Sequence, residues 1–303
     1  MAEHLKYSSP YAHYGYLIYH VVSEGRKLSS RAGDMVELED MMISYSSPRH
    51  MPPQRSRTAD LIGLIEGVQL IAGVSEDALM MRLFPKMLEF TDFESSYGKR
   101  SGAHGQIANV LSQLETNPDT RRAVLSIWDS ELDSTGEGAD RPCTLSIGFR
   151  RRPSPLGVDG VTGSDEVLNM TVTMRSNDVV RGVYGDSIQF MLLLNTFAAA
   201  LGVNVGTYVH HAQSLHVYQS DMDDDTVLKS IQKMANHMPT ELKSRTIKPL
   251  AFPGWNHEQI KEECLTILDF ENERVRPKTE FGNHIRNEMK WRLAQVTKNI
   301  PAS

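Results

Sequence analysis

An apolar stretch near the middle of the chain sets the strongest limit on the fold. Residues 187–201 are apolar nearly all round a helix, which predicts a buried central helix rather than an amphipathic surface helix. Such a helix needs other elements packed around it, and 303 residues supply enough chain for one large domain or two small ones. No run reaches the about 18 apolar residues of a membrane span.

The spacing of hydrophobic residues changes along the chain. Helical spacing comes first, and Gly73 ends the first of these segments. Alternating spacing follows an Asn-Pro-Asp turn at 117–119 and predicts strands. The predicted helices are 61–71, 75–89, 103–114, 187–201, 224–236 and 283–296. The predicted strands are 121–128, 144–151, 168–175, 206–211 and 215–219, with an exposed loop at 154–166. This order favours a mixed α/β fold formed as one domain over residues 1–303.

Charge and cysteine content narrow the functional class. The formal net charge is -6 and the isoelectric point about 6.0, which predicts no basic face for a nucleic acid but allows a small phosphorylated ligand. Two cysteines make no disulfide framework, and no Cys or His spacing is typical of zinc. The N-terminus has no signal-peptide pattern. We therefore expect a cytoplasmic protein without a metal, a membrane or a nucleic-acid partner.

Cys143 is a candidate nucleophile at the start of a predicted strand. It follows Arg141 and Pro142, and a nearby cation lowers the pKa of a thiol, which favours the reactive thiolate. The alternative is that Cys143 only fills space in the core as a small hydrophobic side chain, as most cysteines without a disulfide do.

Two arginine-containing segments suit an anionic ligand. Arg175 and Ser176 end a predicted strand and are typical of a phosphate site, although a solvated strand end explains them equally. Arg121 and Arg122 open another predicted strand. Because adjacent strand residues point to opposite faces, both can reach one phosphate only through a local twist or across a subunit boundary.

Two carboxylates lie in apolar surroundings. Glu66 has Ile62 and Leu70 one helical turn away on either side, so it either reaches water or is held inward with a raised pKa for proton transfer. Asp186 comes just before the apolar helix, where an N-cap role accounts for it locally.

Taken in order, these segments resemble the thymidylate synthase family. R-P-C-T at 141–144, M-R-S-N-D-V-V-R-G-V-Y-G-D at 174–186 and S-L-H-V-Y at 214–218 are similar to three of its motifs. S-R-A-G, E-G-V-Q-L-I-A-G, S-S-Y-G-K-R and N-P-D-T-R-R are similar to four upstream segments. The resemblance runs from about residue 29 to residue 222, with a C-terminal helix within 280–303 beyond it.

The resemblance implies a fold, a reaction and a set of roles. The implied fold is a large mixed sheet with flanking helices, and two such sheets would pack face to face in a homodimer. Cys143 would attack C6 of a pyrimidine nucleotide, Glu66 would organise proton transfer, and Tyr97 would lie beside the base. The carbon donor would be the co-substrate 5,10-methylenetetrahydrofolate.

The resemblance also implies the ligand contacts. The 5′-phosphate would be held by Arg31, Arg175 and Ser176, with Arg121 and Arg122 from the partner subunit. The sugar would be bound by His216 and Tyr218, and the folate side would be formed by Asp178, Phe90 and Phe93.

Departures from the family pattern point to cytosine and to hydroxymethylation. Asp186 replaces the asparagine that reads uracil and resembles the residue of the phage deoxycytidylate hydroxymethylases. Residues 88–93 lack the tryptophan that lies near the folate, and residues 298–303 lack a recognisable closure peptide. Thr144 and Met174 replace a histidine and a glutamine.

The expected activity is therefore 5-hydroxymethylation of dCMP, in the host cytoplasm if the gene is phage-encoded. CMP hydroxymethylation and thymidylate synthesis from dUMP stay open. A non-catalytic nucleotide- or RNA-binding homologue is disfavoured, because such a relative would not need Cys143, Glu66 and Tyr97.

Overall fold

One mixed β-sheet forms the frame of the protein. The computed structural model describes residues 3–89, 93–134, 141–154, 165–224, 229 and 245–298. Within these residues the strand order is β1-β3-β8-β6-β5-β4, with β2 paired to β3 and β7 paired to β8. β8 is antiparallel to β3 and parallel to β6 and β7, so the expected large mixed sheet is confirmed. The strands are β1 Glu3–Tyr7, β2 Arg26–Ser30, β3 Gly33–Tyr45, β4 Val124–Ser126, β5 Thr144–Pro153, β6 Glu166–Met174, β7 Asn177–Asp178 and β8 Asn204–Tyr218.

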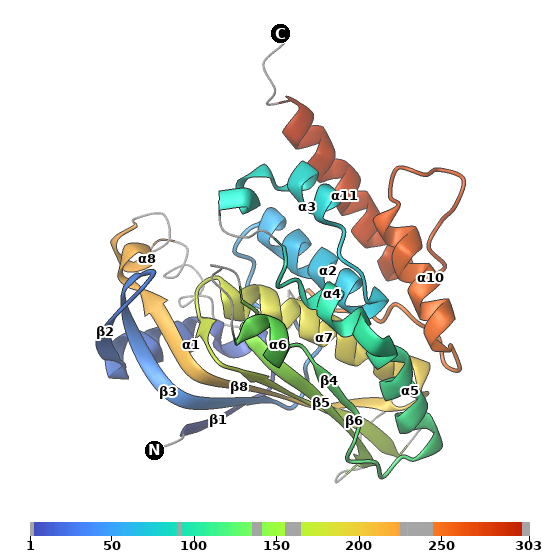
Figure 1. Ribbon diagram of the computed structural model, residues 1–303, viewed down its shortest axis with the longest axis horizontal. Helices are drawn as coiled ribbons and strands as arrows, with labels where there is room; N and C mark the ends of the chain where they lie inside the picture. Colours follow the sequence, from blue (N-terminus) through green and yellow to red (C-terminus); the bar gives the residue numbers. More distant parts are fainter. Residues whose placement is uncertain are drawn as a thin grey trace.

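Helices gather on one face of this sheet, where α7 lies over the strands and α2 and α4 lie over α7 (Figure 1). The helices are α1 Pro10–Glu24, α2 Arg57–Ala72, α3 Asp77–Leu83, α4 Tyr97–Gly102, α5 Gln106–Thr116, α6 Ser130–Asp133, α7 Gly182–Ala200, α8 Gln219–Asp223, α10 His257–Leu268 and α11 Glu280–Lys298. Short 3-10 helices span η1 Pro85–Glu89 and η2 Ala103–Gly105. Among the described residues, no helix is both long enough and apolar enough to span a membrane.

α7 is the buried central helix that the apolar stretch predicts. Nearly all its side chains are buried, including Phe190 and Leu193, which have no solvent exposure. Burial of one such side chain contributes about 1.5–3 kcal/mol to the free energy of unfolding. The packed helix therefore holds the side chains near its start in fixed positions. The helix begins at Gly182, five residues earlier than expected. Asp186 therefore lies inside the helix, and its interpretation as an N-cap was wrong.

α2 packs directly against α7 because two glycines of α2, Gly63 and Gly67, face α7 and leave no side chain between the helices. A Cβ atom on Gly67 would lie 3.0 Å from Cα of Gln189, so a larger residue here would push the two helices slightly apart. The Ser56 side chain caps the first turn by accepting from the Ala59 N–H, and Gly73 ends the helix at φ 68°, as predicted. This close packing brings Glu66 near the start of α7.

Several element boundaries differ from the prediction. The helix expected over 75–89 is broken after Leu83, because Pro85 cannot continue the hydrogen-bond ladder of α3. The two strands expected at 206–211 and 215–219 are one strand, β8, which pairs with β3 from Tyr208 to Tyr218. The strand expected at 121–128 is reduced to β4, so Arg121 and Arg122 precede it rather than open it.

The remaining boundaries follow local geometry. The helix expected at 103–114 begins at Gln106, because His104 and Gly105 have positive φ values that interrupt a continuous helix. The C-terminal helix α11 extends its predicted range at both ends. Most of the helix expected at 224–236 and of the loop at 154–166 lies outside the described residues.

Candidate active site

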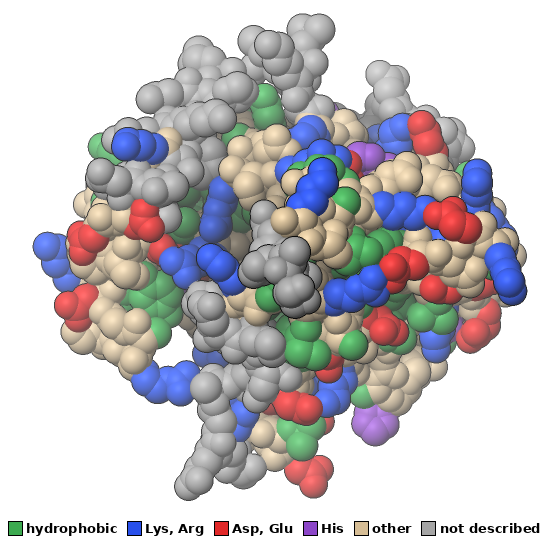
Figure 2. Space-filling view, turned by 90° about the horizontal axis from the view of Figure 1, so that it is seen from above, with side chains coloured by type: hydrophobic (Ala, Val, Ile, Leu, Met, Phe, Trp, Pro, Cys, Tyr) green, Lys and Arg blue, Asp and Glu red, His purple; other side chains and the backbone are tan. Residues whose placement is uncertain are grey.

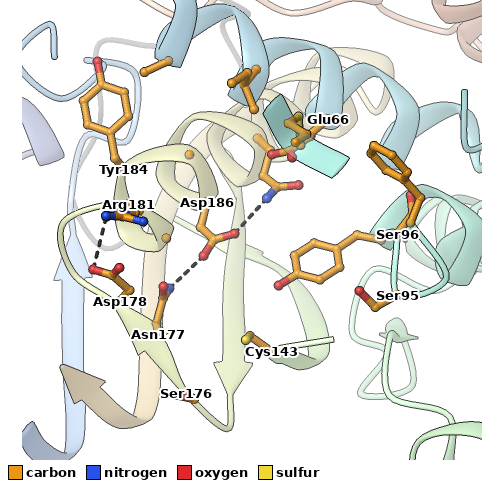
Figure 3. Close-up of a pocket in the computed structure, with 18 of the residues that line it drawn as sticks. Glu66, Ser95, Ser96, Cys143, Ser176, Asn177, Asp178, Arg181, Tyr184 and Asp186 are labelled. Carbon is orange, nitrogen blue, oxygen red and sulfur yellow. Dashed lines mark hydrogen bonds between the residues drawn. The ribbon is translucent and has the colours of Figure 1, made fainter. Parts of the chain in front are cut away.

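A cavity of about 640 Å³ opens where α2, α4, α7, the β7–β8 edge and the segment before β5 meet. Its size is typical of a small-molecule site. It brings together predicted site residues from seven separate parts of the sequence. Those lining it are Arg31, Glu66, Phe93, Tyr97, Cys143, Arg175, Ser176, Asp178, Asp186, His216 and Tyr218. Cys143, Glu66 and Asp186 lie around the same space (Figure 3).

Two predicted site residues do not line this cavity. Arg121 and Arg122 are exposed and lie outside it. Phe90 lies outside the described residues.

The segment that carries Cys143 is braced by Arg175. The Arg175 backbone N–H donates to the Cys143 carbonyl at 2.9 Å, and its guanidinium donates to the carbonyls of Arg141 and Pro142, each at 3.0 Å. The Thr144 N–H donates to the Tyr97 hydroxyl at 3.3 Å. These bonds fix the partly exposed thiol at the cavity wall, and they make Arg175 a support for the nucleophile segment as well as a cation of the site.

Cys264 shows the opposite environment. It is fully buried in α10, and burial raises the pKa of its thiol, with the charge of Glu263 adding to the effect. A thiol of this kind stays protonated and unreactive. Of the two cysteines, only Cys143 lines the cavity.

Glu66 and Asp186 are two buried acids whose pKa values the cavity raises to near neutrality or above. Burial, with an added effect from the charge of the nearby Asp186, raises the pKa of Glu66 to about 8. Burial also raises the pKa of Asp186 to about 7, against the lowering effect of two amide donors. Acids with pKa values near neutrality can both accept and release protons at physiological pH.

The carboxylate of Asp186 is fixed by two amides. Asn177 Nδ2 donates to Oδ2 and Gln189 Nε2 donates to Oδ1, each at 2.8 Å, as the dashed lines of Figure 3 show. Asn177 and Gln189 line the cavity and were not singled out from the sequence. A signal existed for Gln189, because it is a polar residue three positions after Asp186 in an apolar helix.

The opposite side of the cavity carries cations and the sugar-site candidates. Arg31 lies in the turn between β2 and β3, and His216 Nδ1 lies 3.5 Å from the Ser176 hydroxyl. Burial lowers the pKa of His216, whose ring packs edge-on against Tyr218. On the face shown in Figure 2, Lys and Arg side chains are scattered across the surface, some of them near its middle. An anionic group of a small ligand fits here despite the negative net charge.

Asp178 lines the cavity and also stabilises the backbone turn that follows it. Its Oδ1 accepts from the N–H groups of Val180 and Arg181, at 2.7 and 3.2 Å, and so fixes the turn that leads into α7. Arg181 pairs with the buried Asp221. Sequence reasoning missed Arg181, and also Arg55, Ser95 and Ser96, which line the same cavity.

A Glu66→Gln variant is expected to be more stable than the wild type at alkaline pH. Because the folded protein keeps a Glu66 proton that the unfolded chain releases between pH about 4.5 and about 8, the free energy of unfolding falls as pH rises through this range. A neutral amide escapes this loss. We expect a gain on the order of 2 kcal/mol at pH 8.5 and little gain at pH 5, measured by urea unfolding.

The control for this measurement is Glu115→Gln, an exposed glutamate on α5. Its difference from the wild type should not change between the two pH values. An equal effect of Glu66→Gln at both pH values would contradict the raised pKa.

Comparison with known proteins gives the family. The thymidylate synthase family model matches residues 67–272, which is most of the chain. The chain belongs to the thymidylate synthase family. Its cavity residues are spread across the matched segment, and five of them, Arg31, Arg55, Ala59, Ile62 and Glu66, precede it.

Individual members of the family include hydroxymethyltransferases and synthases. The chain is 30% identical over 235 residues to the deoxyuridylate hydroxymethyltransferase of Bacillus phage SP01, covering 71% of this chain and 58% of that protein. It is 32% identical over 218 residues to the same-named enzyme of Pseudomonas phage M6, covering 68% and 58%. It is 31% identical over 189 residues to the thymidylate synthase of Streptococcus sanguinis strain SK36, covering 61% of each chain. The matched segment thus spans less than two thirds of these relatives.

Thymidylate synthases use methylenetetrahydrofolate, and the described part of the cavity has an apolar wall that suits a flat heteroaromatic ligand, formed by Ile62, Met80, Met87 and Phe93. Within the described ranges, no group of three or more His, Cys, Asp or Glu side chains is placed to hold a metal ion.

Proposed function

We propose that this protein transfers a one-carbon unit from 5,10-methylenetetrahydrofolate to C5 of dCMP and yields 5-hydroxymethyl-dCMP. The observation that carries the proposal is the buried carboxyl of Asp186 in the same cavity as Cys143, held by two amide donors. The family supports one-carbon transfer to a pyrimidine nucleotide, and Asp186 supports cytosine as the base.

Cys143 begins the reaction. Its thiolate adds to C6 of the pyrimidine, so that C5 becomes a nucleophilic, enamine-like carbon. The folate supplies one carbon at the oxidation level of formaldehyde. After C5 bonds to this carbon, C5 loses its proton and the bond between the carbon and the folate nitrogen breaks, which releases tetrahydrofolate and leaves an exocyclic methylene. Water then adds to this methylene, and the thiolate leaves C6. The balance is dCMP, methylenetetrahydrofolate and water to 5-hydroxymethyl-dCMP and tetrahydrofolate.

The cytosine edge matches Asp186. Cytosine presents an amino donor at N4 and an acceptor at N3. The carboxylate can accept a hydrogen bond from the N4 amino group. When Asp186 and N3 share one proton, the ring becomes more reactive at C6 toward the thiolate. A mismatched buried polar group costs about 1–3 kcal/mol, which is enough to separate cytosine from uracil.

Water rather than hydride completes the proposed reaction. No tryptophan lines the described part of the cavity, although a tryptophan near the folate is part of the family pattern. A less shielded methylene is open to water. Glu66 and Tyr97 lie at the cavity wall, where Glu66, with a pKa of about 8, can pass protons to and from that water.

Hydroxymethylation of dUMP is the second candidate. It is favoured by the two phage relatives named deoxyuridylate hydroxymethyltransferase. The neutral acid form of Asp186, which its pKa of about 7 permits, can donate to uracil O4 and accept from N3–H.

The proposed homodimer predicts a shared site. Arg121 and Arg122 are exposed and lie outside their own cavity, as expected if they hold the phosphate in the partner subunit. Mixing an inactive Cys143→Ser protein with an inactive Arg121→Ala/Arg122→Ala protein should then restore about a quarter of wild-type activity, because half of the dimers are mixed and each has one intact site.

This mixture is measured after subunits have exchanged. Each inactive protein mixed with itself is the control. No recovery, with exchange confirmed by native mass spectrometry, would contradict the shared site.

Mass spectrometry of products tests the proposed function. Purified protein is incubated with methylenetetrahydrofolate and, separately, with dCMP, CMP or dUMP. Addition of a hydroxymethyl group to dCMP supports the proposal. Faster addition to CMP would instead identify the ribonucleotide as the preferred substrate. Hydroxymethyl-dUMP supports the second candidate, whereas a methyl group on dUMP with formation of dihydrofolate indicates thymidylate synthesis.

A further inference from the structure

A chain of buried polar side chains lies behind Asp186. Asn177 Nδ2, which donates to Asp186 Oδ2, also lies 3.1 Å from His210 Nε2. His210 Nδ1 in turn lies 2.7 Å from the Tyr208 hydroxyl. Asn177, His210 and Tyr208 are at most 3% exposed, and the last two do not line the cavity. Parallel pairing of β7 and β6 with β8 brings this chain together.

In the neutral tautomer with its proton on Nδ1, His210 holds the Asn177 amide with Nδ2 toward Asp186. Burial, followed by the charge of His211, lowers the pKa of His210 to about 4, so its ring is neutral at physiological pH. A neutral ring with its proton on Nδ1 donates to Tyr208 and leaves a lone pair on Nε2 for the second Asn177 N–H. The reversed amide would place its oxygen against two acceptors, Nε2 and the Asp186 carboxylate.

The fixed amide sets what Asp186 offers to a ligand. Asn177 and Gln189 each donate to one of its oxygens, and donors to a carboxylate favour the charged form. A charged carboxylate presents acceptors only. It therefore matches the amino group of cytosine and repels O4 of uracil.

We infer that Asn177, held by His210, is a positioning residue that determines base specificity by keeping Asp186 an acceptor. This inference rests on the proposed function. Without the Asn177 donor, Asp186 becomes more readily neutral, and a neutral acid can donate to uracil O4. Loss of Asn177 should therefore relax the preference for cytosine rather than only weaken the enzyme.

The test compares kcat/KM for dCMP and dUMP in Asn177→Leu, a change of similar volume. The dCMP-to-dUMP ratio should fall about tenfold, which is the typical effect of one lost hydrogen bond to a charged group. His210→Phe should lower the ratio in the same direction by less, because the Asn177 amide keeps one donor but is free to turn. If Asn177→Leu does not fold, His210→Phe decides the outcome.

The matched control is Asn195→Leu. Asn195 is also a buried asparagine, and its amide donates to the carbonyls of Pro48 and Met191 rather than to Asp186. It should lose stability with no change in the ratio. An unchanged ratio in the Asn177 and His210 variants, with a shifted ratio in Asp186→Asn, would overturn this inference alone. An unchanged ratio in Asp186→Asn would overturn the proposed base recognition instead.

Discussion

Cys143→Ser is expected to lower kcat by about 10⁴-fold or more. A serine hydroxyl ionises far less readily than a cysteine thiol, so it is a much weaker nucleophile toward C6 of the base. Nucleotide affinity should stay within a few-fold of the wild type, since the arginines and Ser176 of the cavity are unchanged. Activity is measured by product formation from dCMP, and affinity by calorimetric titration.

Cys264→Ser is the matched control for this variant. Cys264 is the other cysteine of the chain, buried in α10 and outside the cavity, so its replacement should affect stability and leave kcat unchanged. Intact-protein mass spectrometry with a 5-fluoro-pyrimidine nucleotide and methylenetetrahydrofolate adds a direct readout. The C5–F bond cannot release a proton, so the adduct on Cys143 accumulates. Wild-type turnover in Cys143→Ser would refute the covalent mechanism.

Asp186→Asn is expected to change the base preference from cytosine toward uracil. An amide can donate to O4 and accept from N3–H, whereas a charged carboxylate can only accept hydrogen bonds from the base. Because two buried polar contacts change together, the ratio of kcat/KM for dCMP to that for dUMP should fall by about 100-fold or more. The measurement is steady-state kinetics on both nucleotides with one enzyme preparation.

This ratio controls for damage to the fold, since partial unfolding lowers both rates equally. The substitution keeps the volume of a side chain near the start of α7, where Asp186 is 7% exposed. A ratio equal to that of the wild type would remove Asp186 as the reader of the base. In that case the second candidate, hydroxymethylation of dUMP, would no longer need a neutral Asp186.

The elements that depend on local patterns were predictable. The apolar stretch at 187–201 identified the central helix α7, and helical spacing with Gly73 identified α2 and its end. Elements without such a pattern were missed. α1 and α10 were not predicted, and the two strands assigned to β8 are one because β3 and β6 pair along it on either side.

The sequence by itself determined the family of the protein and the candidate residues of its site. Seven segments in order indicated the thymidylate synthase family, and they selected Cys143, Glu66 and Asp186 as the residues of interest. These assignments need only residue types and their order, which folding does not change. The proposed roles of these residues remain for the variants above to test.

Only the tertiary structure decided the environments of these groups. Burial raises the pKa of Glu66 to about 8, and desolvation depends on what packs around a carboxyl rather than on its neighbours in sequence. Likewise, Asp186 meets Asn177 from β7 and Gln189 from its own helix, while His210 fixes Asn177 from β8. The contact between Asn177 and His210 joins residues 33 positions apart in sequence, and it forms only because the sheet places β7 beside β8. No local sequence pattern predicts such a contact.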